Sequence, residues 1–224
     1  PVYHASTILF PSVAALEASQ SHRTDNDTTY YGRFGTPTTF AFQNAVAEID
    51  GGHRAIAVAS GKCAILVALT AFLKSGDHLL MVDTAYGPTR ALCDGFLTKF
   101  GVTTTYYDPL IGSGISNLIR SETRVIFTES PGSQTFEIQD IDAIAEAAHS
   151  RGCVVLLDNP WATPLFFRPF DHGVDVAIQA ATKYIVGHSD AMLGVITTTE
   201  STFKNVQRAA LDFGAPPGPD DVYL

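Results

Sequence analysis

The amino-acid sequence predicts an α/β protein with a mainly parallel, seven-stranded sheet between helices. Short apolar, β-rich runs alternate along the chain with helical segments, and turn residues such as Gly-Asp or Pro separate them. The chain has 224 residues, of which 46% are hydrophobic and 17% are charged. That length and composition suit one large buried core, with at most a small appended part.

The first two strand and helix pairs follow from their turn signals. We expect a strand at residues 55–59 and a helix at 63–73 that begins just past Gly61. A second strand is expected at 79–82. Pro88 then suits the first turn of a helix that runs to Phe100, and Gly101 suits the left-handed residue that closes it.

The remaining elements continue the alternation. Three further strands are expected, a helix precedes the third of them, and Gly152 follows that helix as a stop signal. Two more strands complete the sheet, and the last could run antiparallel. The expected ranges are strands at 102–106, 125–128, 154–157, 174–178 and 194–198, and a helix at 141–149.

The two ends of the chain differ in composition from this alternating region. Residues 19–39 are polar and read as an arm or loop, and residues 214–221 are rich in proline and read as a connector. We therefore divide the chain into an N-terminal arm with a first helix (1–54), an α/β domain (55–213) and the start of a connector (214–224).

Charge and cysteine content exclude several functional classes. The formal net charge is −9 and no run of lysine or arginine occurs, so nucleic acid and anionic membranes are unfavourable partners. Three cysteines without paired spacing indicate a reduced, cytoplasmic location. The apolar residues 56–73 are interrupted by polar ones and read as strand, turn and helix, and no secretion signal is visible.

Chemically useful residues follow the ends of five predicted strands. In open α/β sheets, ligands bind beyond the carboxyl ends of the strands, where these residues would share one edge. They are Gly61 with Lys62, Tyr86, Glu129, Asp158 and Lys183.

Lys183 and Asp158 have the chemistry of a pyridoxal phosphate site. A lysine whose pKa is lowered by burial or by nearby cations can form a Schiff base, and an aspartate can hold a pyridine nitrogen protonated. Asp158 ends the apolar run Val-Val-Leu-Leu, so its carboxylate needs a partner. The alternatives are a surface lysine and a helix-capping aspartate, and residue types alone leave them open.

The cofactor's phosphate and ring would also need partners. The backbone amides of Gly61 and Lys62, the hydroxyl of Thr182 and the guanidinium of Arg33 could bind a phosphate. Tyr86 could stack on the ring. A glycine at a turn and a tyrosine at a strand end also occur for ordinary packing reasons, so these two assignments stay open.

The motifs together resemble the Cys/Met-metabolism family of pyridoxal phosphate enzymes, and within it the cystathionine β-lyase branch. The resemblance covers nearly the whole chain and implies the fold type I cofactor domain of these enzymes. The motifs, in order, are YYGRFGTPTT, the Ser60-Gly61 turn, DTAYGPT, ESPGS, LLDNPWATP and QAATKYIVGHSDAMLG.

The resemblance implies a role for each matching position. Lys183 would bond covalently to pyridoxal 5′-phosphate and act as acid and base, Asp158 would pair with the pyridine nitrogen, and Tyr86 would stack on the ring and assist catalysis. Three positions would bind the phosphate within the subunit: Gly61, Lys62 and Thr182.

Other positions imply self-association and a substrate wall. Tyr31 and Arg33 would reach the cofactor of a neighbouring subunit, which implies a dimer as the smallest complete unit. Because the family is usually tetrameric, the resemblance also implies a tetramer. Trp161 would line the substrate side. Ala180 stands where many members have serine, and Lys62 where a small or neutral residue is usual, so its ammonium could bind phosphate or face solvent.

The implied activity is a carbon–sulfur β-lyase. Such an enzyme cleaves L-cystathionine or related cysteine S-conjugates to a thiol (homocysteine from cystathionine), pyruvate and ammonia, in methionine biosynthesis. Members also carry a smaller C-terminal domain with an arginine that binds the substrate carboxylate, and we expect that arginine beyond Leu224. The alternatives are γ-elimination or γ-synthase chemistry, and a catalytically silent cofactor-domain fragment.

Metal and hydrolase chemistry have no sequence support. The seven histidines form no HxxxH or cysteine-histidine pattern, so we expect no metal site. Nucleophile-elbow, dinucleotide-binding and phosphate-loop motifs do not occur.

Overall fold

A computed structural model describes residues 1–25 and 27–224, and its centre is one sheet of seven strands in the order β1-β7-β6-β5-β4-β2-β3. β7 pairs antiparallel with both β1 and β6, and all other neighbours are parallel. The expected α/β class and the antiparallel last strand are confirmed. The strands are β1 (Arg54–Val58), β2 (His78–Val82), β3 (Thr103–Tyr107), β4 (Thr123–Glu129), β5 (Val154–Asp158), β6 (Val176–Gln179) and β7 (Gly194–Thr198).

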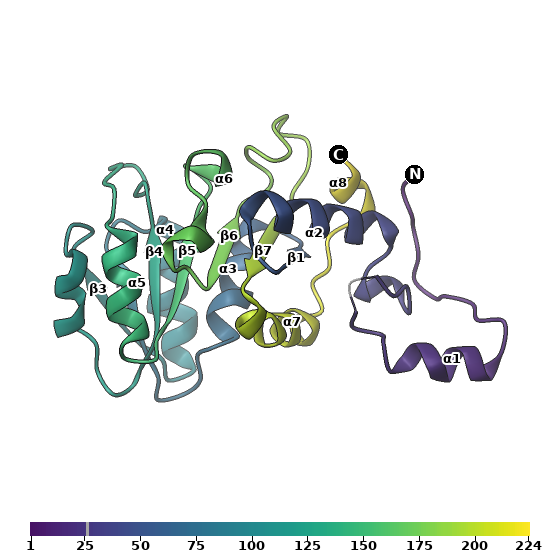
Figure 1. Ribbon diagram of the computed structural model, residues 1–224, viewed down its shortest axis with the longest axis horizontal. Coiled ribbons are helices and arrows are strands. Elements are labelled where there is room, and N and C mark those ends of the chain that lie inside the picture. Colours follow the sequence, from purple (N-terminus) through teal and green to yellow (C-terminus); the bar gives the residue numbers. More distant parts are fainter. Residues whose placement is uncertain (26) are drawn as a thin grey trace.

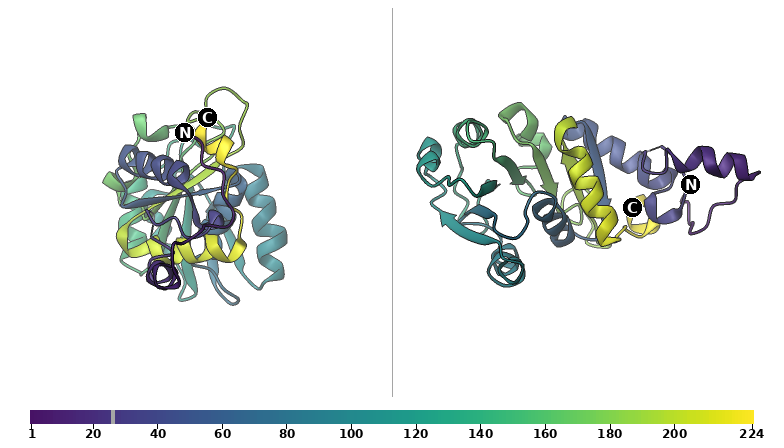
Figure 2. Two further views of the ribbon diagram at one scale, coloured as in Figure 1. Left: turned by 90° about the vertical axis from the view of Figure 1, so that its right-hand side faces the viewer. Right: turned by 90° about the horizontal axis from the view of Figure 1, so that it is seen from below.

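Helices cover both faces of the sheet (Figures 1 and 2). α3 (Gly61–Thr70) and α4 (Gly87–Ala91) lie behind the sheet in the view of Figure 1, and α4 continues as a π-helical segment, η2 (Leu92–Leu97). α5 (Ile141–His149) lies in front. Helices on both faces explain why the central strands are apolar without alternation.

The core is built from these continuous apolar strands. Every residue of β2 is buried, and Ile126, Phe127, Leu156 and Leu157 on β4 and β5 are fully enclosed. Such burial contributes on the order of 2 kcal/mol per large side chain before conformational entropy is counted. A rigid central sheet therefore fixes where its strand-end residues lie.

Two connections leave the sheet in opposite directions. The chain passes from β2 through α4 outward to β3, and from β4 through α5 in the other direction to β5. Right-handed crossovers in opposite directions place α4 and α5 on opposite faces, so a crevice forms between the carboxyl ends of β2 and β4. This topological switch point positions the candidate site.

Several expected boundaries differ by a few residues. α3 begins at Gly61 itself because the Ser60 hydroxyl accepts a hydrogen bond from the Cys63 amide (3.2 Å). The apolar residues 56–73 divide into β1, a turn at Ser60 and α3, as expected. The helix expected from Pro88 begins at Gly87 and includes the π-helical turn of η2, which its sequence pattern did not indicate.

The chain ends contain more helix than expected. The arm or loop at residues 19–39 includes the end of α1 (Val13–Gln20), a 3-10 turn, η1 (Gly32–Phe34), and the start of α2 (Pro37–Asp50). α7 (Glu200–Phe213) packs beside β1 and β7, and the proline-rich connector turns into α8 (Pro219–Tyr223). Proline fits the first turn of α2 and of α8, so it begins these helices instead of excluding them.

The remaining elements of the chain are short. α6 (Thr163–Phe166) and two further 3-10 turns, η3 (Gly112–Asn117) and η4 (Pro169–His172), complete the fold. Within the described residues, no helix combines the length and apolarity that a membrane crossing requires.

Candidate active site

A cavity of about 580 Å³ lies at the carboxyl ends of the parallel strands. It brings together side chains that are up to 132 positions apart, from Ser60 to Met192. The structure places seven of the nine predicted site residues in its wall: Gly61, Lys62, Tyr86, Asp158, Trp161, Thr182 and Lys183.

Lys183 lies in a turn that follows β6 and faces Tyr86. Its amide donates to the Ala180 carbonyl (2.9 Å), and its carbonyl accepts from the Gly187 amide (2.7 Å), so the backbone is held on both sides. The Nζ atom lies 5.7 Å from the centre of the Tyr86 ring, and both side chains are exposed. The amine is thus accessible to a ligand that enters the cavity.

Asp158 is the buried carboxyl of the cavity, with 5% of its surface exposed. No hydrogen-bond donor pairs with this carboxyl among residues 1–25 and 27–224. Burial raises the pKa of the Asp158 carboxyl well above its ordinary value, the charge of Glu129 raises it further, and the Lys183 ammonium lowers it. A cationic ligand group would therefore stabilise the Asp158 carboxylate.

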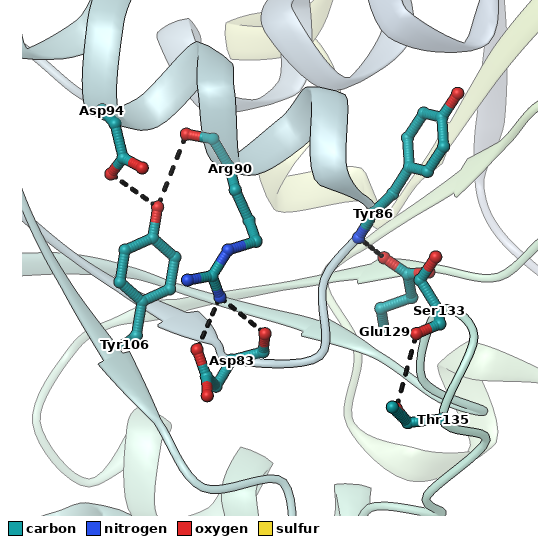
Figure 3. Close-up of polar contacts among 8 residues, drawn as sticks. All are labelled: Asp83, Tyr86, Arg90, Asp94, Tyr106, Glu129, Ser133 and Thr135. Atoms are coloured by element: carbon teal, nitrogen blue, oxygen red, sulfur yellow. Dashed lines mark hydrogen bonds and ion pairs between the residues drawn. The ribbon is translucent and has the colours of Figure 1, made fainter.

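Glu129 is a second buried carboxyl in the same wall. It pairs with Asp158 across β4 and β5, and its Oε2 atom accepts a hydrogen bond from the Tyr86 amide (2.7 Å). Burial raises the pKa of Glu129, while the Tyr86 amide and Lys183 oppose that shift. Figure 3 shows the Tyr86 amide directed at the Glu129 carboxylate, with Ser133 beside it.

The start of α3 forms one end of the cavity. The Ser60 carbonyl and hydroxyl accept from the Ala64 and Cys63 amides, which leaves the preceding amides of Gly61 and Lys62 without a helical partner. Amides of this kind at the start of a ten-residue helix favour an anion.

Gly61 is required by close packing. A Cβ atom at this position would lie 2.7 Å from the Ala180 Cβ atom. The small size of Gly61 and that of Ala180 are thus related, because the two residues lie against one another where β6 ends.

Thr182 lines the cavity and also joins the two sides of the loop that contains Lys183. Its hydroxyl accepts from the Leu193 amide (2.8 Å) and lies 3.3 Å from the Leu193 carbonyl. The hydroxyl proton has two weak intramolecular acceptors, the Leu193 carbonyl and the Met192 sulfur (3.6 Å), so donation to a phosphate remains chemically available.

Trp161 belongs to an aromatic wall that the sequence did not indicate. Its ring packs edge-on against Phe136, with ring centres 5.0 Å apart. Gln134 and Phe136 both have positive φ (66° and 63°), a conformation that side chains rarely adopt, so the loop after β4 is strained where it lines the cavity.

Tyr31 and Arg33 lie elsewhere. They border a separate cavity between the N-terminal segment, at the right of Figure 1, and residues 214–219 near the end of the chain. The Arg33 guanidinium contacts the Phe34 ring (4.8 Å to its centre) and donates to the Leu211 carbonyl (3.3 Å). The structure therefore does not bring these two residues to the Lys183 cavity of their own chain.

Several cavity residues were not assigned from sequence. Glu129 was recognised as a strand-end residue but received no role, although the motif ESPGS that contains it was noted. Apolar residues gave no signal, because in sequence they resemble ordinary core positions. The unassigned residues are Ser60, Ile65, Pro88, Glu129, Ser133, Gln134, Phe136, Pro160, Ala180 and Met192.

Comparison with known proteins agrees with this geometry. The family model described as "Cys/Met metabolism PLP-dependent enzyme" matches residues 1–224. The chain belongs to this family. The predicted family is confirmed, and pyridoxal 5′-phosphate is the cofactor on which the family depends.

Individual relatives include several cystathionine β-lyases. A putative cystathionine beta-lyase of Rhizobium johnstonii is 48% identical over 223 residues, which are 100% of this chain and 55% of that protein. The cystathionine beta-lyase of Escherichia coli is 39% identical over 225 residues, covering 100% and 57%. The chain thus spans about half the length of these relatives.

A solved structure shows the same fold. The cystathionine gamma-lyase of Lactobacillus plantarum, crystallised with L-serine, superposes with a TM-score of 0.90 at 28% identity. The superposition covers 100% of this chain and 56% of that one.

The cavity residues fit pyridoxal 5′-phosphate. Asp158 is a buried carboxyl that no donor among the described residues reaches, Lys183 is an accessible amine, and the α3 amides favour an anion. These three groups match the ring nitrogen, the aldehyde and the phosphate of that cofactor. Within the described residues, no group of three or more His, Cys, Asp or Glu side chains could hold a metal ion.

Proposed function

We propose that the protein is a pyridoxal phosphate-dependent carbon–sulfur β-lyase that cleaves L-cystathionine to homocysteine, pyruvate and ammonia, within methionine biosynthesis. The observation that carries this proposal is the convergence of Lys183, Asp158 and the start of α3 on one cavity. The cystathionine beta-lyases among its relatives support the choice of substrate.

The role proposed for each residue follows from its position in the cavity. When bound, the cofactor supplies an electron sink for the substrate's α-carbon. Lys183 would hold the cofactor covalently until the substrate amine takes its place, and the freed Lys183 amine would then remove the α-proton as a general base. The carbon–sulfur bond breaks with both electrons passing to sulfur, and a proton from Lys183 or Tyr86 neutralises the thiolate. Asp158 keeps a positive charge on the ring nitrogen, and Trp161 with Phe136 shields the apolar side of the substrate.

Product analysis tests the reaction. Incubation with L-cystathionine should release pyruvate and homocysteine in equal amounts, with ammonia. Pyruvate formation that requires added pyridoxal phosphate supports the proposal. Absence of pyruvate under conditions where the cofactor is shown to be bound contradicts it.

Two alternatives have specific support. The solved neighbour named cystathionine gamma-lyase favours γ-elimination, which would give cysteine and 2-oxobutyrate instead. A relative from Wolbachia pipientis wMel, named L-alanine/L-glutamate racemase, is 40% identical and needs the same α-proton removal. Chiral analysis of alanine after incubation distinguishes racemisation, and cofactor binding without any product would indicate a silent cofactor domain.

Complete sites are proposed to need a second subunit. Tyr31 and Arg33 do not line the cavity of their own chain, so they are proposed to bind the phosphate in a neighbouring subunit's cavity. A dimer is then the smallest active unit and a homotetramer its expected assembly. Free thiols at Cys63, Cys93 and Cys153 support a cytoplasmic location.

A further inference from the structure

Glu129 occupies the topological switch point of the sheet. It is the last residue of β4, and Tyr86 lies in the turn between β2 and α4. The two residues therefore lie at the carboxyl ends of adjacent parallel strands whose next helices leave to opposite faces. A hydrogen bond between them therefore spans the crevice at its closed end.

The bond joins a side chain to a backbone that carries a cavity residue. The Glu129 Oε2 atom lies 2.7 Å from the Tyr86 amide nitrogen, a short distance typical of a charge-assisted bond (Figure 3). The Tyr86 side chain is 44% exposed and its ring faces the Lys183 amine. Because the ring is only partly covered by other side chains, the position of the Tyr86 backbone helps to determine where it stands.

The cost of burying Glu129 indicates that the bond matters. Only 4% of the Glu129 surface is exposed, and its nearest strand partner is another carboxyl, Asp158. Burying two carboxyls side by side is unfavourable unless each is hydrogen-bonded or paired. An apolar residue at position 129 would satisfy the strand equally well, but it would offer the Tyr86 amide no acceptor.

We propose that Glu129 is a positioning residue: by bonding the Tyr86 amide, it holds the Tyr86 ring over the cofactor cavity. Asp158 beside it is left to pair with the cofactor. This inference rests on the cofactor site of the proposed function but does not depend on which elimination the enzyme carries out.

Two substitutions test separately the length and the charge of the Glu129 side chain. Glu129→Gln keeps an acceptor oxygen at the same distance and removes the charge, whereas Glu129→Asp keeps the charge and shortens the side chain by one methylene. Pyridoxal 5′-phosphate is titrated into each apoprotein and followed by quenching of Trp161, the one tryptophan in the sequence, which lines the same cavity. Glu146→Gln, exposed on α5, serves as the control.

Positioning predicts that Glu129→Gln binds within about threefold of the parent and that Glu129→Asp binds about tenfold more weakly. The reverse order, or equal weakening by both, overturns the proposal. The Tyr86→Ala background adds an independent check, because Glu129→Asp should cost nothing further when the ring is absent. A full tenfold loss in that background also overturns it.

Failure of the proposed function has a different signature. The titration uses no substrate, so a protein that makes 2-oxobutyrate or no product at all can still show the expected order of affinities. Conversely, correct pyruvate production with the reversed order would reject only the role of Glu129.

Discussion

Glu129 and Asp158 are register partners on neighbouring parallel strands, and both carboxyls are buried in the wall of one cavity. Each therefore has a pKa raised by burial, and the charge of Glu129 raises the pKa of Asp158 further. A positively charged group on the cofactor would stabilise the ionised form of Asp158. Cofactor binding is thereby linked to the ionisation of this carboxyl.

The Asp158→Asn variant should lose turnover while keeping its fold. The amide cannot stabilise a positive ring nitrogen, so we expect the rate of pyruvate formation to fall at least about a hundredfold. The pKa of Asp158 is higher in the folded protein than its ordinary value of 3.8. The carboxyl therefore destabilises the folded apoprotein increasingly as the pH rises above 3.8. Urea unfolding at pH 8 should consequently show a more stable variant apoprotein, and unchanged turnover would refute the assigned role.

Lys183→Ala should abolish covalent attachment of the cofactor. After borohydride reduction and denaturation, intact mass should show the cofactor on the parent protein and not on the variant, because no other assigned group can form the bond. Lys204→Ala, exposed on α7, is the matched control and should retain the added mass. Retention of the cofactor mass by Lys183→Ala would contradict the assignment of Lys183 as the residue that bonds the cofactor.

Arg33→Ala and Lys183→Ala proteins should complement one another when their subunits exchange. Arg33 does not line its own Lys183 cavity, so a hybrid can combine one intact Arg33 with one intact Lys183. Partial recovery of activity is expected, up to about a quarter of sites in a randomly mixed dimer. Exchange is verified by native mass spectrometry, and no recovery after verified exchange counts against the shared site.

Gly61→Ala should damage the start of α3. The added Cβ atom would meet the Ala180 Cβ atom at 2.7 Å, and overpacking of this kind costs about 1–3 kcal/mol of unfolding free energy. Affinity for pyridoxal phosphate should fall as well, since the shifted amides bind the phosphate. Gly95→Ala is the control, because a Cβ atom there meets nothing within 4 Å. If the two variants had equal unfolding free energies in urea, the structure would have adjusted to the contact with Ala180 at little cost, which would contradict this prediction.

Asp50→Asn should flatten the dependence of stability on pH. Asp50 is fully buried at the end of α2 and accepts a hydrogen bond from the Thr197 hydroxyl, and burial raises its pKa from 3.8 to about 6. The folded protein holds a proton that the unfolded chain releases, so stability falls as pH rises from about 4 through 6, by about 3 kcal/mol in total. Unfolding free energies at pH 4.5 and pH 8 measure the change, and an equally steep fall in the variant would contradict the cause given.

The strands and the strand-end residues could be read from sequence because their cause is local. Apolar runs such as those of β2 and β5 have no alternative but burial, and Asp158 or Lys183 after such a run must emerge at the sheet edge. Helices whose sequence patterns are weaker were harder to predict. The polar start of α2 and the proline-rich start of α8 looked like loop, since proline has the same appearance in a turn and in the first turn of a helix.

By itself, the sequence determined the fold class and the polar residues at the sheet edge, because periodicity and residue chemistry are properties of short segments. The resemblance of its motifs indicated the family. Only the tertiary structure decided that Glu129 bonds the Tyr86 amide, that Phe136 joins Trp161 in one wall, and that Arg33 lies away from its own chain's cavity. These relationships join residues from separate strands and loops. They depend on strand order and register, which local sequence patterns do not encode.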